Sequence, residues 1–191
     1  MVDSRLRVYF RLLKESPMFR ASRVLCAAVV CLSIPMSAAG QPAADGYRLP
    51  YDIVKGNITK AAEQMSEADY AFKPTPDVRS FGQLLGHIAN ANFMICSMAS
   101  GEKSTASGDA EKLATKAEIQ KALADSFAFC DKAWTVVGGE RASAPVDLFG
   151  MKFNAASAMS FNSAHDWEHY GNIVTYMRLK GMVPPSSQGR N

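Results

Sequence analysis

Apolar residues recur at the helical period in four segments of the chain, and this pattern restricts the fold more than any other feature. In the clearest segment the spacings are three and four residues: Ile119, Leu123, Phe127, Cys130, Trp134 and Val137. Such spacings place side chains on one face of an α-helix. Thr115 and Glu118 have the spacing of a capping box, which satisfies free amides of the first helical turn. We therefore predict an amphipathic helix that starts near Thr115 and stops at Gly138-Gly139.

Three further segments are predicted to be helices, over residues 52–65, from Ser80 to just before Ser100, and over 154–180. The second has another capping box, formed by Ser80 and Gln83. The stretch 148–153 also permits a hairpin-like turn. Because an amphipathic helix is not stable alone, the four apolar faces are expected to pack together. The predicted fold class is therefore all-α, a four-helix bundle.

The N-terminal part of the chain has the pattern of a secretory signal peptide. Arg20 and Arg23 precede an apolar run over residues 24–34, and small residues follow. The run is too short for a membrane anchor, since a spanning helix needs about 20 residues. We interpret residues 1–40 as a signal-peptide region, with Met18 as the candidate true start. The protein is then expected to be periplasmic or secreted, with no stable membrane anchor after cleavage.

Removing residues 1–40 changes the charge of the protein. The full chain has 21 basic and 18 acidic residues, and six basic and two acidic residues precede Gln41. The remaining domain has 15 basic and 16 acidic residues, a net charge of −1. Nucleic-acid binding needs a positive field against the phosphates. A nearly neutral domain therefore predicts no nucleic-acid partner.

Two of the four cysteines, Cys96 and Cys130, lie outside the signal-peptide region. An even number of cysteines in an oxidising compartment favours a disulfide. Both residues fall on neighbouring predicted helices, so they are the disulfide candidate. The alternative is a pair of buried free thiols that act as small apolar residues.

The chain has three histidines, His87, His165 and His169. His165 and His169 are four residues apart in the last predicted helix, so both imidazoles can reach one ion. His87 lies in the middle of the second predicted helix, at a depth where another helix can face it. Three imidazoles leave coordination positions open for water or substrate. The alternative is that these histidines are packed or exposed residues without a ligand role.

Other polar residues of the last helix are assigned by their position on its faces. Asn172 and Tyr176 continue the stripe of His165 and His169, so we predict that they support the ligands from the second shell. Interhelical hydrogen bonding or exposure is the alternative for both. Asp166 and Glu168 flank the histidines but are predicted to point away from the stripe as surface charges; the alternative is that one of them is a fourth ligand.

Two stretches of the sequence resemble the DinB-like superfamily. The first is YAFKPTPDVRSFGQLLGHIA, residues 70–89, and the second is HDWEHYGNIVTYMRLKGMVPP, residues 165–185. Together they contain every histidine, and the resemblance extends over most of residues 41–191, which would form one DinB-like four-helix bundle domain. It implies a bundle that is often described as up-down-down-up. It also implies a metal triad of one histidine from the second helix and two from the last, which are His87, His165 and His169 here.

The resemblance also implies a range of functions, since the family includes thiol-dependent transferases and isomerases as well as hydrolases. We expect an exported protein that binds a divalent metal ion and acts as a metal-dependent hydrolase or thiol-dependent transferase on a small molecule. Hydrolysis is favoured because low-molecular-weight thiols are cytosolic. The alternatives are a non-catalytic binding module of the cell envelope for a metal or small ligand, and a metal-free structural bundle.

The sequence does not single out one metal or one partner. Imidazole ligands suit several divalent ions. Zinc and nickel are the leading candidates, and iron, manganese and copper are further ones. A homodimer is common among such bundles by resemblance, and the small-molecule substrate is not specified by any motif.

Overall fold

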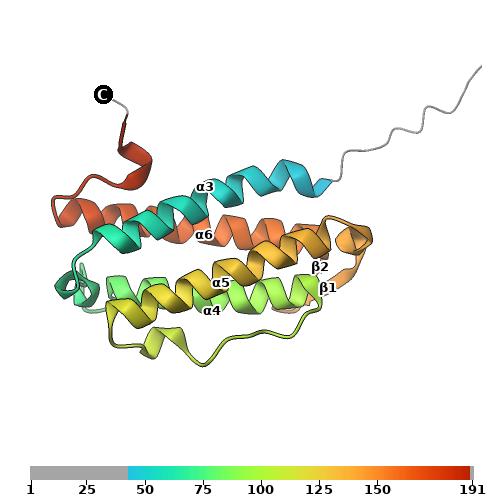
Figure 1. The fold of residues 1–191 in the computed structure, drawn as a ribbon, viewed down its shortest axis with the longest axis horizontal. Coiled ribbons are helices and arrows are strands. Elements are labelled where there is room, and N and C mark those ends of the chain that lie inside the picture. Colours follow the sequence, from blue (N-terminus) through green and yellow to red (C-terminus); the bar gives the residue numbers. More distant parts are fainter. Residues whose placement is uncertain (1–42, 190–191) are drawn as a thin grey trace, which may run out of the picture. The chain divides into compact units, whose positions relative to one another are not determined.

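The computed structural model describes residues 43–189 of the chain. The predicted signal-peptide region over residues 1–40 and the candidate start Met18 lie outside the described residues. Four long helices make up most of the described part: α3 (Ala43–Gln64), α4 (Phe81–Ser100), α5 (Lys116–Val137) and α6 (Ala155–Leu179). They pack side by side along their lengths (Figure 1). The prediction of an all-α four-helix bundle is confirmed.

The sequence signals at the helix starts are present as hydrogen bonds. Ser80 and Gln83 form a complete capping box at the start of α4, and Thr115 and Glu118 form another at the start of α5. Asn154 caps α6 by accepting a hydrogen bond from the Ser157 amide. These caps set the direction in which each helix leaves its loop.

The predicted start of the first helix was wrong. We expected a start at residue 52, but α3 begins at Ala43 and contains Pro50. A proline lacks the amide proton of one helical hydrogen bond, which disfavours it inside a helix without excluding it. Before Pro50, Arg48 holds the helix by ion pairs with Asp52 and with Asp131 of α5. After Pro50, the apolar face of α3 is buried against the bundle, with Tyr51, Val54 and Ile58 fully buried.

A short β-hairpin connects α5 to α6, where the sequence permits a hairpin-like turn. Its strands are β1 (Pro145–Leu148) and β2 (Met151–Asn154), paired antiparallel. The turn is made by Phe149 and Gly150, both with positive φ. Leu148 is fully buried and packs with Ile95 of α4, so the hairpin covers one end of the bundle.

The helices α4 and α5 run in the same direction. Asn92 of α4 donates to Ser126 of α5, and Cys96 is joined to Cys130 four residues further along both helices. The two cysteines are fully buried, and their Cα atoms are 5.3 Å apart. Because the helices are parallel, the chain between them must return along the whole bundle (Figure 1).

The helix α6 runs against α4. The Asn162 amide donates to Asn92 over 2.8 Å, whereas His87, earlier in α4, faces His169, later in α6. The bundle core is shared by all four helices and the hairpin; its largest fully buried side chains are Tyr51, Ile58, Met65, Phe81, Leu85, Ile88, Ile95, Phe127, Leu148, Met159, Ile173 and Met177. None of the helices in the described part has a long enough apolar stretch to cross a membrane.

Candidate metal centre

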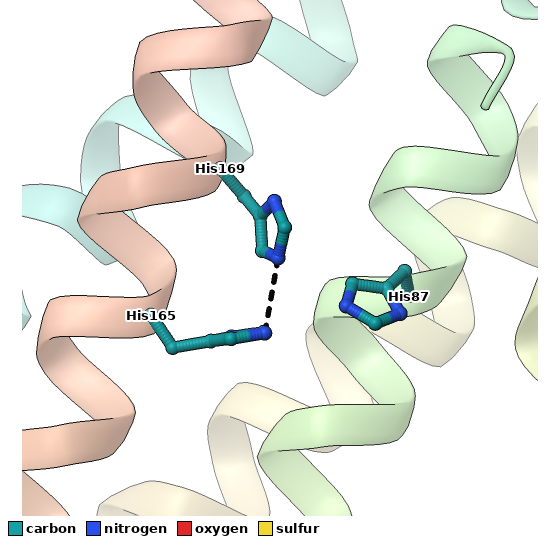
Figure 2. Close-up of side chains that lie close together, drawn as sticks. All are labelled: His87, His165 and His169. Atoms are coloured by element: carbon teal, nitrogen blue, oxygen red, sulfur yellow. Dashed lines mark hydrogen bonds between the residues drawn. The ribbon is translucent and has the colours of Figure 1, made fainter. Parts of the chain in front are cut away.

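The three histidines meet between α4 and α6. His87 comes from α4, and His165 and His169 come from adjacent turns of α6 (Figure 2). One nitrogen from each imidazole can be chosen so that all three lie within 4.8 Å of one another. All three side chains are partly buried. The structure thus brings together the residues that the sequence predicts as ligands, in a cluster that can hold a metal ion.

The closest pair of nitrogens belongs to His165 and His169. Their Nε2 atoms are 3.0 Å apart and face each other (Figure 2). Two ligands held at about 2.0 Å from one tetrahedral ion lie roughly 3.3 Å apart. The separation therefore fits two ligands of the same ion with little movement, and it also fits a hydrogen bond from one protonated ring to the other.

The environment of α6 keeps these two rings neutral. Burial, together with the nearby histidines, lowers the pKa of His165 to about 4. Burial, with the positive charges of His87 and Arg79, lowers the pKa of His169 to about 4 as well. A metal ion binds the unprotonated imidazole. Both rings are therefore in the metal-binding form at neutral pH.

Glu111 holds His87 in place. His87 Nδ1 lies 2.9 Å from Glu111 Oε1, and the other carboxylate oxygen accepts from Arg79 Nε over 2.9 Å. Burial opposes ionisation of Glu111, but the hydrogen bonds from Arg79 and His87 outweigh it and lower the pKa of the carboxyl. A carboxylate on one ring nitrogen fixes the tautomer and leaves the other nitrogen as the ligand. For His87 that nitrogen is Nε2.

A close approach of two backbones brings Glu111 to His87. Glu111 lies in the 3-10 turn η2 (Ala110–Lys112), which packs on α4 at Gly86. A Cβ atom on Gly86 would lie only 2.4 Å from the Ala110 carbonyl oxygen. Asn90 fixes the turn by accepting from the Ala110 amide and donating to Asp109.

Glu111 and Arg79 were not among the site residues predicted from the sequence. Neither belongs to a helical stripe, since Glu111 follows a polar loop and Arg79 precedes a helix cap. The available signal was Gly86, a glycine inside a helical pattern directly before His87. A glycine has no Cβ atom and so permits the close approach of another group to the backbone.

Asn172 and Tyr176, which were predicted to support the metal ligands, make different contacts. Asn172 Nδ2 lies 3.5 Å from His169 Nδ1, which is at the outer limit of a hydrogen bond. The Tyr176 hydroxyl donates to the Arg79 carbonyl oxygen over 2.6 Å and not to a histidine. Tyr176 is therefore connected to the centre only through Arg79 and Glu111.

The prediction that Asp166 is a surface charge was wrong. Its side chain is fully buried between the helices. Oδ2 accepts a long hydrogen bond of 3.5 Å from Asn162 Nδ2, and Oδ1 has no partner within the described residues. Burial raises the pKa of this carboxyl well above its ordinary value. The single stripe assumed from sequence was too narrow, because α6 contacts both α3 and α4 and so buries more than one face. Glu168 is exposed, as expected.

An open groove of about 720 Å³ lies beside the histidines. Its wall includes His169 and Asn172 of α6, Leu84 of α4, Glu111, and much of the segment from Lys73 to Arg79. Since His169 is part of this wall, the groove gives a small molecule a route to the candidate metal centre.

Fold and site together define a helical-bundle protein with a histidine triad between two helices. The chain matches the family model of the DinB superfamily over residues 51–173 and therefore belongs to this superfamily. The family prediction is confirmed.

Among solved structures, the fold resembles that of a DinB-like protein from Bacillus cereus ATCC 10987, whose crystal structure was determined at 2.01 Å resolution. The TM-score is 0.62 and the sequence identity is 14%, with 74% of this chain and 95% of that chain covered. At this identity the likeness supports the fold alone. A search of curated proteins found no match.

Proposed function

We propose that this protein is an exported DinB-superfamily metalloprotein that binds one divalent metal ion through His87, His165 and His169 and acts on a small molecule, by hydrolysis or group transfer. The observation that carries the proposal is the convergence of all three histidines of the sequence at one point beside an open groove. Zinc and nickel are the first candidate metals, because both accept imidazole ligands.

The chain supplies a suitable donor set. His165 and His169 are neutral at neutral pH, and Glu111 leaves Nε2 of His87 free to coordinate. Three protein ligands leave a position open, as in catalytic zinc sites. A bound divalent ion would lower the pKa of a water or thiol at that position and polarise a substrate oxygen. The groove volume is within the range of small-molecule sites, roughly 300–1,000 Å³.

Export is proposed from two independent features. The sequence over residues 1–40 has the order of a signal peptide. The disulfide between Cys96 and Cys130 suits an oxidising compartment. Hydrolysis is favoured over thiol transfer because low-molecular-weight thiols are mainly cytosolic. N-terminal sequencing of the protein from the periplasm or medium would test export, and recovery of the uncleaved chain in the cytoplasm alone would contradict it.

A non-catalytic binding module is the second candidate, and one observation favours it. Two carboxylates line the groove, Glu111 and Asp77. Glu111 already bonds to both Arg79 and His87, and Asp77 is exposed. Neither is poised as a general base in the way that general acid–base catalysis requires.

A substrate panel distinguishes enzyme from binding module. The metal-loaded protein and its His165→Ala variant would be tested against ester, amide and epoxide substrates. Turnover by the native protein that is lost in the variant would support the enzyme. Metal binding without turnover of any substrate would favour the binding module, and turnover retained in the variant would contradict the proposed site.

A further inference from the structure

We propose that the groove beside the histidines selects small molecules that carry a carboxylate, which Lys73 and Arg79 bind while another group of the same molecule faces the metal centre. This inference rests on the proposed function, because it names the substrate class of that site.

Both cations line the groove and have donors to spare. Lys73 is exposed and makes no ion pair within the described residues. Arg79 bonds to Glu111 through Nε alone, and its Nη1 and Nη2 make no hydrogen bond to the part of the chain that the structure describes. The free edge of a guanidinium matches a carboxylate in a two-bond arrangement.

Arg79 is close to the metal centre. Its carboxylate partner Glu111 is also the partner of His87. Arg79 and His169 also line the same groove. A ligand that bonds to Arg79 is therefore within reach of the histidines.

The segment that carries both cations is held in place before any ligand binds. We call residues 72–81 the proline strap, since it contains Pro74 and Pro76. Its ends are joined where the Phe81 amide donates to the Phe72 carbonyl oxygen over 3.0 Å. The hydrogen bond from Tyr176 to the Arg79 carbonyl oxygen fixes the strap to α6. Pre-ordering of this kind lowers the entropy cost of binding.

The charges of the groove favour an anion when a divalent ion is present. Lys73 and Arg79 are opposed by Glu111, whose oxygens are both engaged, and by Asp77, which has no ion pair within the described chain. The four side chains sum to zero, so a bound dication gives the groove a net positive charge. Apolar side chains of Pro74, Pro76, Val78 and Leu84 line the same groove and can contact a short carbon chain. A small carboxylic acid has both features.

The test uses matched probes and the metal-loaded protein. Monohydroxamates of succinic, glutaric and adipic acid carry a metal-binding hydroxamate at one end and a carboxylate at the other. Their amide analogues replace the carboxylate with a neutral carboxamide of similar size. Affinities would be measured by isothermal titration calorimetry, with metal content determined on the same samples. We expect at least one acid probe to bind about tenfold or more tightly than its amide, as charge-assisted hydrogen bonds allow.

Variants show whether the strap causes the preference. The preference is the ratio of the affinities for an acid probe and its amide analogue. Lys73→Gln should reduce this ratio several-fold, and Asp77→Asn should increase it. Lys60→Gln should leave it unchanged, because Lys60 is exposed on α3 and outside the groove. Equal affinity for acid and amide probes in a metal-loaded protein would overturn this inference and leave the metal site intact. A full preference retained in Lys73→Gln would also overturn it. A protein that binds no metal would overturn the proposed function as well.

Discussion

Glu111 is the residue through which the loop after α4 acts on the candidate metal centre. Its carboxylate bonds to His87 and Arg79 at 2.9 Å each. Replacing Glu111 with alanine should lower metal affinity about 10- to 100-fold, as loss of a carboxylate partner of a histidine ligand does. Competition with a chromogenic chelator measures this affinity. Glu102→Ala, an exposed change in the same loop, is the control; equal affinity in both variants would show that Glu111 does not support His87.

Asp166 makes stability depend on pH. Burial raises the pKa of its carboxyl in the folded state, so the folded protein binds a proton that the unfolded chain releases above about pH 4. This group therefore stabilises the fold less as pH rises from about 4 toward the raised pKa. Asp166→Asn should raise the melting temperature near neutral pH, and the gain should shrink as pH falls to about 4.

Thermal unfolding at several pH values, followed by circular dichroism, measures this effect. Glu168→Gln is the matched control, because Glu168 is exposed on α6, two residues after Asp166. A variant that is less stable than the native protein at every pH would show that Asp166 is ionised and paired in the fold.

At the residue scale, the sequence predicted the contacts that follow from the spacing of residues along one helix. It did not predict the contacts that depend on where a loop packs. His165 and His169 could be paired because they are four residues apart on one helix. Glu111 could not be paired with His87 from the sequence, since their contact depends on where η2 packs on α4. Asp166 was assigned wrongly because a hydrophobic pattern does not show that a carboxyl lies in the core.

At the scale of elements, the contact between η2 and α4 depends on Gly86. A methyl group at this position would lie 2.4 Å from the Ala110 carbonyl oxygen and push the turn away. Gly86→Ala should therefore destabilise the fold by about 1–3 kcal/mol. It should also weaken metal binding, because Glu111 moves with the turn.

Gly56→Ala is the control for this prediction, since nothing lies within 4 Å of the added Cβ atom on α3. There the substitution should stabilise the protein by about 0.5–1 kcal/mol, because alanine is the better helix former. Denaturant unfolding measures both changes. Equal effects of the two variants would contradict the role given to Gly86.

The disulfide between α4 and α5 closes a long loop. Cys96 and Cys130 are 34 residues apart in sequence. The loop-entropy model gives a disulfide of this span about 4 kcal/mol of stabilisation. The double variant Cys96→Ala/Cys130→Ala should lose roughly that amount in denaturant unfolding. Reductant should destabilise the native protein and leave the variant unchanged; native stability that is insensitive to reductant would contradict a formed bond.

Helix boundaries were predictable where a cap was present. Both capping boxes lie where the sequence places them, because the capping residues make their bonds within one helical turn. The last helix, predicted over residues 154–180, begins at Ala155. The start of α3 was not predictable, because the part before Pro50 is held by Arg48, which pairs with Asp52 and with Asp131 of α5, and no periodic pattern shows these contacts. The hairpin between α5 and α6 has too few residues for a periodic signal.

At the scale of the whole molecule, the family and the bundle followed from the sequence, and the groove did not. Four apolar stripes are enough to predict a bundle, and the match over residues 51–173 confirms the superfamily. The groove needs the proline strap, α4, α6 and the loop before α5 to meet in space. The proposed export, the metal's identity and a homodimer stay predictions.

The central claim is that the three histidines bind one metal ion. The most direct test is metal content by mass spectrometry of the protein purified without a polyhistidine tag, beside the His87→Ala and His165→Ala variants. The account predicts about one equivalent of a divalent metal in the native protein, lost in both variants. A native protein that holds no metal and takes up neither added zinc nor nickel would contradict it, and the histidines would then be packing residues.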